Sequence, residues 1–487
     1  MEREQGAGGQ KRAPRAVVVG GGVAGLCAAL ELRGRGIDVT VLEAADRWGG
    51  CVGSHEVAGL TLDSGAESFA TRTDGVKSLL GDLGLASEIV APHPSGAWVQ
   101  LPRGAEELPK AGILGIPSNP WDPEVRSALG LWGSLRASLD RYLPTRPPTD
   151  QANVAAVVRS RMGKRVLERL VAPVVGGVHS ANPELLDIDM VAPGLRALMA
   201  ERGSLAAAVA AQRERSAVRS GAKAGSAVAG IRGGMNRLVD ALVERLADDG
   251  VTLLSGQRAE RLDHSGETWH VGTAAADGTT QTFDAELVVV ALGGPAAVEL
   301  LSDAVPELAG QEPVPGPEVK LVTLVLDKPE LDARPRGTGV LVAPQSPGLQ
   351  AKALTHATAK WSWLAEQAGP GTHVVRLSYG RAEDAGRPLD DGPETDDELF
   401  RAALADASIL LTVPVAPEDV LGWDVVRWEG ALPFATVGHR ERVGEIRRLI
   451  AAQPGLAVVG GWAAGNGLAS VVPDARKQAG ELADRSV

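Results

Sequence analysis

The chain is poor in cysteine and in aromatic side chains. Its 487 residues include 2 cysteines, 2 tyrosines and 4 phenylalanines, and aromatic residues make up only 3%. Two cysteines, Cys27 and Cys51, cannot cross-link a fold of this size, so its stability must come from a buried core. The same usage fits a reducing compartment and argues against a zinc centre, so we expect no metal.

The chain also lacks an excess of positive charge. Its 49 basic and 61 acidic residues give a net charge of -12. An acidic protein has little surface with which to neutralise phosphates, so we expect no nucleic-acid partner. At roughly 150 residues per domain, the length predicts about three structural units or one elaborated fold.

No apolar run is long enough to cross a membrane. The longest run of apolar residues and glycine covers 16–30, whereas a bilayer needs about 20 residues. Basic residues before it imitate a signal peptide, but the glycines at 20–22 suit a strand-to-helix turn better than a signal helix. We predict a cytoplasmic protein without a transmembrane helix, whose membrane contact is at most peripheral.

Three separated segments share the pattern of buried strands. Residues 16–19 predict a strand, 23–33 a helix and 37–42 a second strand, which together form a βαβ unit. The apolar runs at 285–292 and 456–459 likewise end in glycine turns. This pattern predicts an α/β fold with one parallel sheet assembled from distant segments.

Two other sequence patterns lie between these segments. Residues 122–216, rich in Ala, Leu and Arg at helical spacing, predict a helical region. Residues 319–327 and 373–379 alternate like half-buried strands of a second, antiparallel sheet. Loops are expected at 216–229 and 381–397, and a disordered tail at 1–14.

A glycine motif, Gly20-x-Gly22-x-x-Gly25, lies between the first strand and the first helix. Gly20 permits the tight turn, Gly22 lets a pyrophosphate approach the backbone, and Gly25 lets the helix pack closely on the strand. The positive end of the helix faces the phosphates. Glu43, at the end of the next strand, is placed to accept hydrogen bonds from a ribose. The motif in this context predicts dinucleotide binding.

Two more segments offer backbone to a long ligand. They are EAADRWGG at 43–50 and DSGAESFATR at 63–72, and a nicotinamide enzyme does not need them. With GGGVAGL at 20–26 and GLAVVGGWAAGNGLASVV at 455–472, they resemble the FAD-dependent amine oxidase and protoporphyrinogen oxidase superfamily.

Segments in the middle of the chain indicate one branch of this superfamily. VAPVVGGVHSANPELLDIDMVAPGL at 171–195 and GGMNRLVDAL at 233–242, with GAESFATR at 65–72, resemble the oxygen-dependent oxidases of haem synthesis. The match is to their bacterial coproporphyrinogen III oxidase branch and extends over 16–482. Amine oxidases would share the first and last motifs but not the one at 171–195.

The resemblance implies an architecture of three parts within the α/β class. A Rossmann-like FAD-binding domain would be built from the discontinuous segments 15–85, 226–300 and 430–487. A substrate-binding domain with a mixed or antiparallel sheet would take 86–115 and 301–429, and a helical domain, which faces a membrane in some relatives, would take 116–225.

The resemblance also implies FAD as the cofactor and indicates its contacts. Relatives carry Val at the position of Ala259, and a Gly-Ile-Pro-Asp-Cys-like sequence where this chain has GNGLASVV. With Arg47, Gly49 and Gly50 of the second segment included, the candidate cofactor residues are Gly20, Gly21, Gly22, Val23, Ala24, Gly25, Glu43, Ala44, Arg47, Gly49, Gly50, Cys51, Gly65, Ala66, Glu67, Ser68, Ala259, Trp428, Gly461, Asn466, Gly467 and Leu468.

The activity implied is the six-electron oxidation of coproporphyrinogen III to coproporphyrin III, with O2 as acceptor and H2O2 as product. The flavin carries this chemistry, so we predict no essential acid–base residue. The substrate's propionates need cations, and arginine binds carboxylates through two parallel hydrogen bonds. Arg72 is the first candidate for this role, and Arg103 and Arg376 are alternatives.

Other functions stay open at this point. The substrate could be protoporphyrinogen IX, which carries two propionates instead of four. The chain could be another flavin amine oxidase or a carotenoid desaturase. It could also be a non-catalytic porphyrin-binding partner that hands the tetrapyrrole to the next haem enzyme, of the ferrochelatase type. Such a partner would bind porphyrin without consuming O2.

Overall fold

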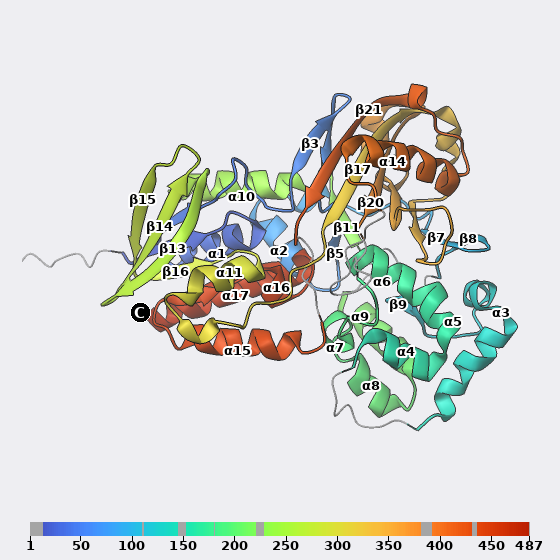
Figure 1. Cartoon of the computed structure of the whole chain (residues 1–487), viewed down its shortest axis with the longest axis horizontal. Helices are drawn as coiled ribbons and strands as arrows, with labels where there is room; N and C mark the ends of the chain where they lie inside the picture. Colours follow the sequence, from blue (N-terminus) through green and yellow to red (C-terminus); the bar gives the residue numbers. More distant parts are fainter. Residues whose placement is uncertain are drawn as a thin grey trace, which may run out of the picture.

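A computed structural model of the chain describes residues 13–109, 112–144, 152–179, 181–220, 228–380, 392–430 and 436–486. The described residues form three parts that meet near the middle of the molecule (Figure 1). One part is built on a parallel sheet, one on a larger mixed sheet, and one is helical. Within the described ranges, none of the helices is long and apolar enough to cross a membrane.

The parallel sheet has five strands in the order β12-β2-β1-β16-β22. Its strands come from distant parts of the chain, which confirms the sheet predicted from separated segments. They are β1 (Arg15–Val19), β2 (Asp38–Leu42), β12 (Thr252–Leu254), β16 (Leu287–Val290) and β22 (Leu456–Val458).

Both faces of this sheet are covered, which explains its continuous apolar strands. In β1, Ala16 and Val18 face one core, while Val17 and Val19 face another. The first core is closed by α1 (Val23–Gly34), α10 (Asn236–Asp248) and α17 (Leu468–Ser486). The second is closed by α11 (Gly294–Ser302), α15 (His439–Ala451) and the antiparallel strands β13 (Gln257–Ser265), β14 (Thr268–Ala275) and β15 (Thr280–Ala285).

The strand predicted at 285–292 is wrong in its bounds. Ala285 ends β15, and β16 begins only at Leu287. Between them, the Glu286 amide donates to the Arg15 carbonyl at 3.1 Å, and the Glu286 carboxylate accepts from the Arg15 amide at 2.7 Å. Glu286 is therefore the point at which the chain passes from one sheet to the other.

The second sheet has seven strands in the order β21-β17-β20-β19-β18-β7-β8. All neighbours are antiparallel except β18 and β7, so the sheet is mixed. The strands are β7 (Trp98–Leu101), β8 (Gly104–Glu107), β17 (Val319–Asp327), β18 (Gly339–Val342), β19 (Ala353–His356), β20 (Thr372–Tyr379) and β21 (Val420–Trp428).

The half-buried pattern predicted for β17 is wrong, because every residue from Val319 to Leu326 is buried. Helix α14 (Asp396–Leu411) covers one face of β17 and shares a core with Leu324. On the other face, Val325 packs against the hairpin of β3 (Ser54–Val57) and β4 (Leu60–Asp63). A strand covered on both sides loses the apolar–polar alternation of a surface strand.

The predicted helical region is confirmed for the residues described. It comprises α3 (Pro123–Ser138), the 3-10 helix η2 (Leu139–Tyr142), α4 (Val154–Met162), α5 (Lys164–Val166), the π-helix η3 (Leu167–Val171), α6 (Ala172–His179), α7 (Ile188–Val191), α8 (Leu195–Arg202) and α9 (Leu205–Ser220). A buried ion pair links three of these helices. Arg161 Nε donates to Asp140 Oδ1 at 2.6 Å, and Asp140 Oδ2 accepts from the Ala206 amide at 2.9 Å.

Both internal loops were predicted too long. The segment 216–229 begins inside α9, which runs to Ser220, and ends in β11 (Val228–Ile231). The segment 381–397 ends in α14, because Thr395 and Glu398 form a reciprocal capping box at that helix. Residues 221–227 and 381–391 lie outside the described residues, as do residues 1–12 of the predicted tail.

The borders predicted between the three parts stay a prediction, and two elements cross them. β6 (Ile89–Val90), expected in the substrate part, pairs with β11, which also pairs with β5 (Phe69–Ala70). The β3–β4 hairpin, expected in the cofactor part, packs on the second sheet. The chain segments between 54 and 90 therefore join the two sheets.

Candidate functional site

The glycine turn between β1 and α1 has the geometry that its sequence predicts. Gly20 has φ +107°, and its amide donates to the Leu42 carbonyl at 2.7 Å. A Cβ added to Gly25 would lie 1.9 Å from the Gly20 carbonyl oxygen, so only glycine allows α1 to approach β1 this closely. A Cβ on Gly22 would meet no atom of the described chain within 4 Å. The backbone at Gly22 therefore faces open space beside the N-terminus of α1.

Glu43 links this turn to the turn that follows β2. Its Oε2 accepts from the Gly21 amide at 2.7 Å, and its Oε1 accepts from the Ala45 amide at 2.8 Å. The Glu43 carbonyl accepts from the Gln257 amide at 2.8 Å, which brings the start of β13 and Ala259 to the same region. The ribose contact of Glu43 stays a prediction, but its carboxylate lies at the turn where a dinucleotide would bind.

The second glycine segment lies directly on the first. The Gly49 amide donates to the Gly21 carbonyl at 2.8 Å, and Gly49 forms a parallel bridge with Gly22. Arg47 donates to the Gly50 carbonyl at 3.0 Å, and its guanidinium lies 5.0 Å from the centre of the Trp428 ring. Trp428 is the last residue of β21, so this contact reaches the second sheet.

The third segment, 63–68, packs against the second. The Ala66 amide donates to the Cys51 carbonyl at 3.0 Å, and the Trp428 indole donates to the Ser64 carbonyl at 2.9 Å. A Cβ on Gly65 would lie 2.1 Å from the Cys51 carbonyl oxygen, so this contact also requires glycine. Three separate glycine segments from the first 70 residues are thus held side by side.

The C-terminal segment completes the site. Gly461 begins α16 (Gly461–Ala464), and Asn466 and Gly467 lead into α17 at Leu468. The start of α17 is tied to the chain after β5, because Arg72 donates to Ser470 Oγ at 2.6 Å and Thr73 donates to the Ala469 carbonyl at 3.1 Å. In Figure 1, β5, β11 and α16 lie near the centre, where the three parts meet.

A buried group of charged side chains holds the third segment in place. Glu67 forms ion pairs with Lys360 and, at 3.1 Å, with Arg376. Arg376 also donates to the carbonyls of Asp63 at 3.0 Å and Gly65 at 2.8 Å. Although burial opposes it, the two cations hold the pKa of Glu67 below its usual value. Sequence reasoning missed Lys360, which lies in the four-residue helix α12 (Ala357–Lys360) and has no local motif.

The three candidate arginines occupy different places. Arg72 is exposed and borders the start of α17. Arg376 is largely buried and is engaged by the 63–67 segment, which argues against its predicted role on a substrate propionate. Arg103 lies exposed in the turn between β7 and β8, at the outer edge of the second sheet. The structure therefore brings Arg72 and Arg376 to the predicted cofactor residues and leaves Arg103 apart.

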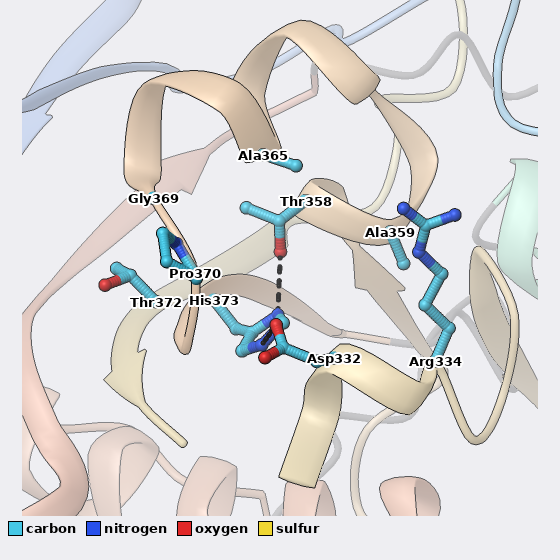
Figure 2. A pocket seen from close by; sticks show the side chains of 9 residues that line it. All are labelled: Asp332, Arg334, Thr358, Ala359, Ala365, Gly369, Pro370, Thr372 and His373. Carbon is cyan, nitrogen blue, oxygen red and sulfur yellow. Dashed lines mark hydrogen bonds and ion pairs between the residues drawn. The ribbon is translucent and has the colours of Figure 1, made fainter. Parts of the chain in front are cut away.

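A polar cavity of about 120 Å³ lies beside the second sheet, lined by Asp332, Arg334, Thr358 and His373 among others (Figure 2). His373 Nε2 lies 3.1 Å from Asp332 Oδ1, and its Nδ1 lies 3.0 Å from Nε2 of the buried His356. Burial, aided by His373 and Arg334, lowers the pKa of His356 to about 3. In the part of the chain that the structure describes, no three His, Cys, Asp or Glu side chains gather as a metal site.

Comparison with known proteins gives one consistent result. A family described as flavin containing amine oxidoreductase matches residues 23–485. The coproporphyrinogen III oxidase of Propionibacterium freudenreichii is 30% identical over 97% of this chain and 91% of its own length. The enzyme of that name from Mycobacterium leprae is 30% identical over 93% and 95%. A crystal structure from Exiguobacterium, provisionally named a protoporphyrinogen oxidase, covers 97% of this chain and 99% of its own, with a TM-score of 0.79 at 24% identity.

Proposed function

Because the chain belongs to the flavin-containing amine oxidoreductase family, we propose that it is an FAD-dependent oxidase that converts coproporphyrinogen III to coproporphyrin III. O2 is the acceptor and H2O2 the product. The names of the two full-length bacterial relatives support this substrate. The observation that carries the proposal is the packing of the three glycine segments on one another beside the open backbone of Gly22, with the start of α17 tied to the chain after the third segment.

The residues present fit a flavin dinucleotide. Gly22 leaves space at the N-terminus of α1 for the pyrophosphate, and Glu43 has carboxylate lone pairs left for a ribose. The further contacts are those predicted along the second, third and C-terminal segments. When bound, the flavin takes two electrons at a time from the substrate and passes them to O2, so a six-electron oxidation needs three cycles.

The chain itself supplies binding, orientation and exclusion of water. Arg72 stands exposed at the border of the site, where it can meet a propionate through its planar guanidinium. Arg103 and Arg376 are weaker candidates because of where they lie. We assign no catalytic acid or base, since the chemistry belongs to the cofactor.

An aerobic assay of the purified, FAD-loaded protein tests the proposal. Coproporphyrinogen III and protoporphyrinogen IX are compared side by side, with porphyrin fluorescence and H2O2 followed together. We expect faster oxidation of the coproporphyrinogen, with three H2O2 formed per porphyrin. A preference for protoporphyrinogen IX would contradict the proposed substrate and favour the alternative one. Bound flavin without turnover of either would contradict the oxidase and direct the search to amines and carotenoids.

The proposal includes a cytoplasmic location, at most peripheral membrane contact, and transfer of the product to a ferrochelatase-type enzyme. An exposed apolar face on α3 and η2, with Leu131, Leu139 and Tyr142 more than half exposed, is where such contact would form. Any membrane-associated protein should be released by a salt or carbonate wash. A requirement for detergent would contradict the peripheral assignment.

A further inference from the structure

We infer that Glu67, Lys360 and Arg376 form a charge clamp, in which the charge of Glu67 sets the reduction potential of the bound flavin. The inference rests on the proposed function, because it takes the 63–68 segment as a flavin contact. In this view Glu67 is a positioning residue. It acts through the segment that it anchors and through its charge.

The clamp ties one part of the molecule to another. Glu67 belongs to the segment that packs on Cys51 beside the glycine turn. Its partners are Arg376, from strand β20 of the second sheet, and Lys360, from the short helix α12 that follows β19. The side chains of Glu67, Lys360 and Arg376 are only 15%, 15% and 13% exposed, so water screens these charges poorly.

The net charge of this group depends on each of its members. Asp63 also faces the group, and its Oδ1 accepts from the Met235 amide at 2.7 Å. Burial raises the pKa of Asp63 to about 7, so Glu67 is the main negative charge that stands against the two cations, Lys360 and Arg376. Lys360 has a further neighbour in Trp361, whose ring centre lies 5.1 Å from Nζ. Loss of the Glu67 charge makes the site more positive, and loss of the Lys360 charge makes it more negative.

This balance should affect the flavin because reduction adds negative charge to the ring. An excess of positive charge nearby stabilises the reduced form, and an excess of negative charge destabilises it. Glu67→Gln leaves the cations in excess and should raise the reduction potential. Lys360→Met removes one positive charge and should lower the reduction potential.

The opposite signs separate an electrostatic role from a packing role. A clamp that merely held the segment in place would loosen in both variants and shift the potential in the same direction. The double variant Glu67→Gln with Lys360→Met removes one charge of each sign, so its potential should return towards that of the unchanged protein. Lys360→Arg keeps the charge and should also behave like the unchanged protein.

The experiment measures the flavin reduction potential of each purified holoprotein under anaerobic conditions, against a reference dye of known potential. The dissociation constant of the flavin–sulfite adduct is a second readout. It should fall in Glu67→Gln and rise in Lys360→Met. Lys164→Met is the matched control, because Lys164 pairs with Glu168 on the surface and its side chain is 76% exposed. Circular dichroism verifies that each variant is folded.

Potentials that shift in the same direction in both single variants, or in neither, would overturn the inference. So would a Lys360→Arg protein that matches Lys360→Met. If one single variant does not fold, the other still decides, because its potential must shift with the stated sign while those of the double variant and of Lys360→Arg stay near the unchanged potential. An unchanged protein that binds no flavin would instead contradict the proposed function, so the two failures are distinguishable.

Discussion

Gly22 and Gly25 lie three positions apart in one turn, yet the structure gives them different tasks. Gly25 is required by the fold, because a Cβ there would lie 1.9 Å from the Gly20 carbonyl oxygen. Gly22 faces open space, so its missing side chain matters only to a ligand. The sequence motif predicted both tasks, and the structure separates them into one contact within the chain and one surface open to a ligand.

This difference predicts that alanine substitutions at the two positions have different effects. Gly25→Ala should lower the free energy of unfolding of the flavin-free protein by about 1–3 kcal/mol or more through overpacking against backbone. Gly22→Ala should leave that free energy nearly unchanged but weaken flavin binding. Urea unfolding of the flavin-free protein and titration with FAD measure the two effects. Equal destabilisation of both flavin-free variants would refute the assignment.

Arg72 is the residue on which the propionate prediction now depends. Removal of a hydrogen bond to a charged group costs about 1.5–3 kcal/mol, so Arg72→Met should raise KM for coproporphyrinogen by about 10-fold or more. The flavin content should not change. Arg103→Met is the control, since Arg103 lies in an exposed turn at the far edge of the second sheet. A KM that responds to Arg103 and not to Arg72 would reverse the assignment.

At the scale of helices and strands, short sequence patterns predicted the elements that local interactions determine. The βαβ unit, the helical region and β20 follow from periodicity within short windows. The capping box of Thr395 and Glu398 was also readable and should have placed the start of α14. By contrast, the burial of β17 and the end of β15 at Ala285 depend on elements that pack from elsewhere in the chain.

The helical part depends on one buried ion pair. Arg161 and Asp140 are 8% and 2% exposed in their side chains, and Arg161 also donates to the carbonyls of Leu143, Pro144 and Gly203. Asp140→Ala should cost about 3–5 kcal/mol, because it leaves a buried guanidinium unpaired. The double variant with Arg161→Met should cost less than the sum of the two single variants.

Urea unfolding with a double-mutant cycle measures this coupling. The control is the surface pair of Lys164 and Glu168, whose removal should cost less than about 1 kcal/mol. Additive losses at Asp140 and Arg161 would show that the pair contributes no specific coupling.

At the scale of the whole molecule, two buried groups give the stability opposite dependences on pH. His356 has a folded pKa of about 3 against an ordinary 6.5, chiefly through burial, so acid protonates the unfolded chain first. The titration of His356 therefore lowers the free energy of unfolding as pH falls below 6.5. Burial raises the pKa of Asp63 from 3.8 to about 7, so its effect lowers stability as pH rises through that range.

Replacement of His356 should remove its contribution to the pH dependence of stability. The difference in free energy of unfolding between the unchanged protein and His356→Asn should shrink as pH falls from 6.5 to 4. The slope should be up to about 1.4 kcal/mol per pH unit, the value for one proton. Urea unfolding at several pH values measures it. A difference that stays constant with pH would show that His356 titrates alike in both states.

The clamp shows what sequence reasoning could not reach at this scale. Glu67 lay inside a recognised motif, but Lys360 and Arg376 are some 300 residues away along the chain, in elements with no motif of their own. Their meeting depends on how the second sheet docks against the 63–68 segment. Such a contact is a property of the tertiary fold and has no signature in any short window.

The parallel sheet also has a consequence for how the protein is made. Its central strand β1 leaves the ribosome first, whereas its edge strand β22 and the helix α17, which packs on α1, are synthesised last. Pairings between the two ends of a chain form slowly, and incomplete sheets expose edges that aggregate. The glycine turn therefore lies in an incomplete sheet until β22 and α17 have been synthesised. Capture of the proposed cofactor should therefore follow the synthesis of α17, and until then the sheet has an unpaired edge.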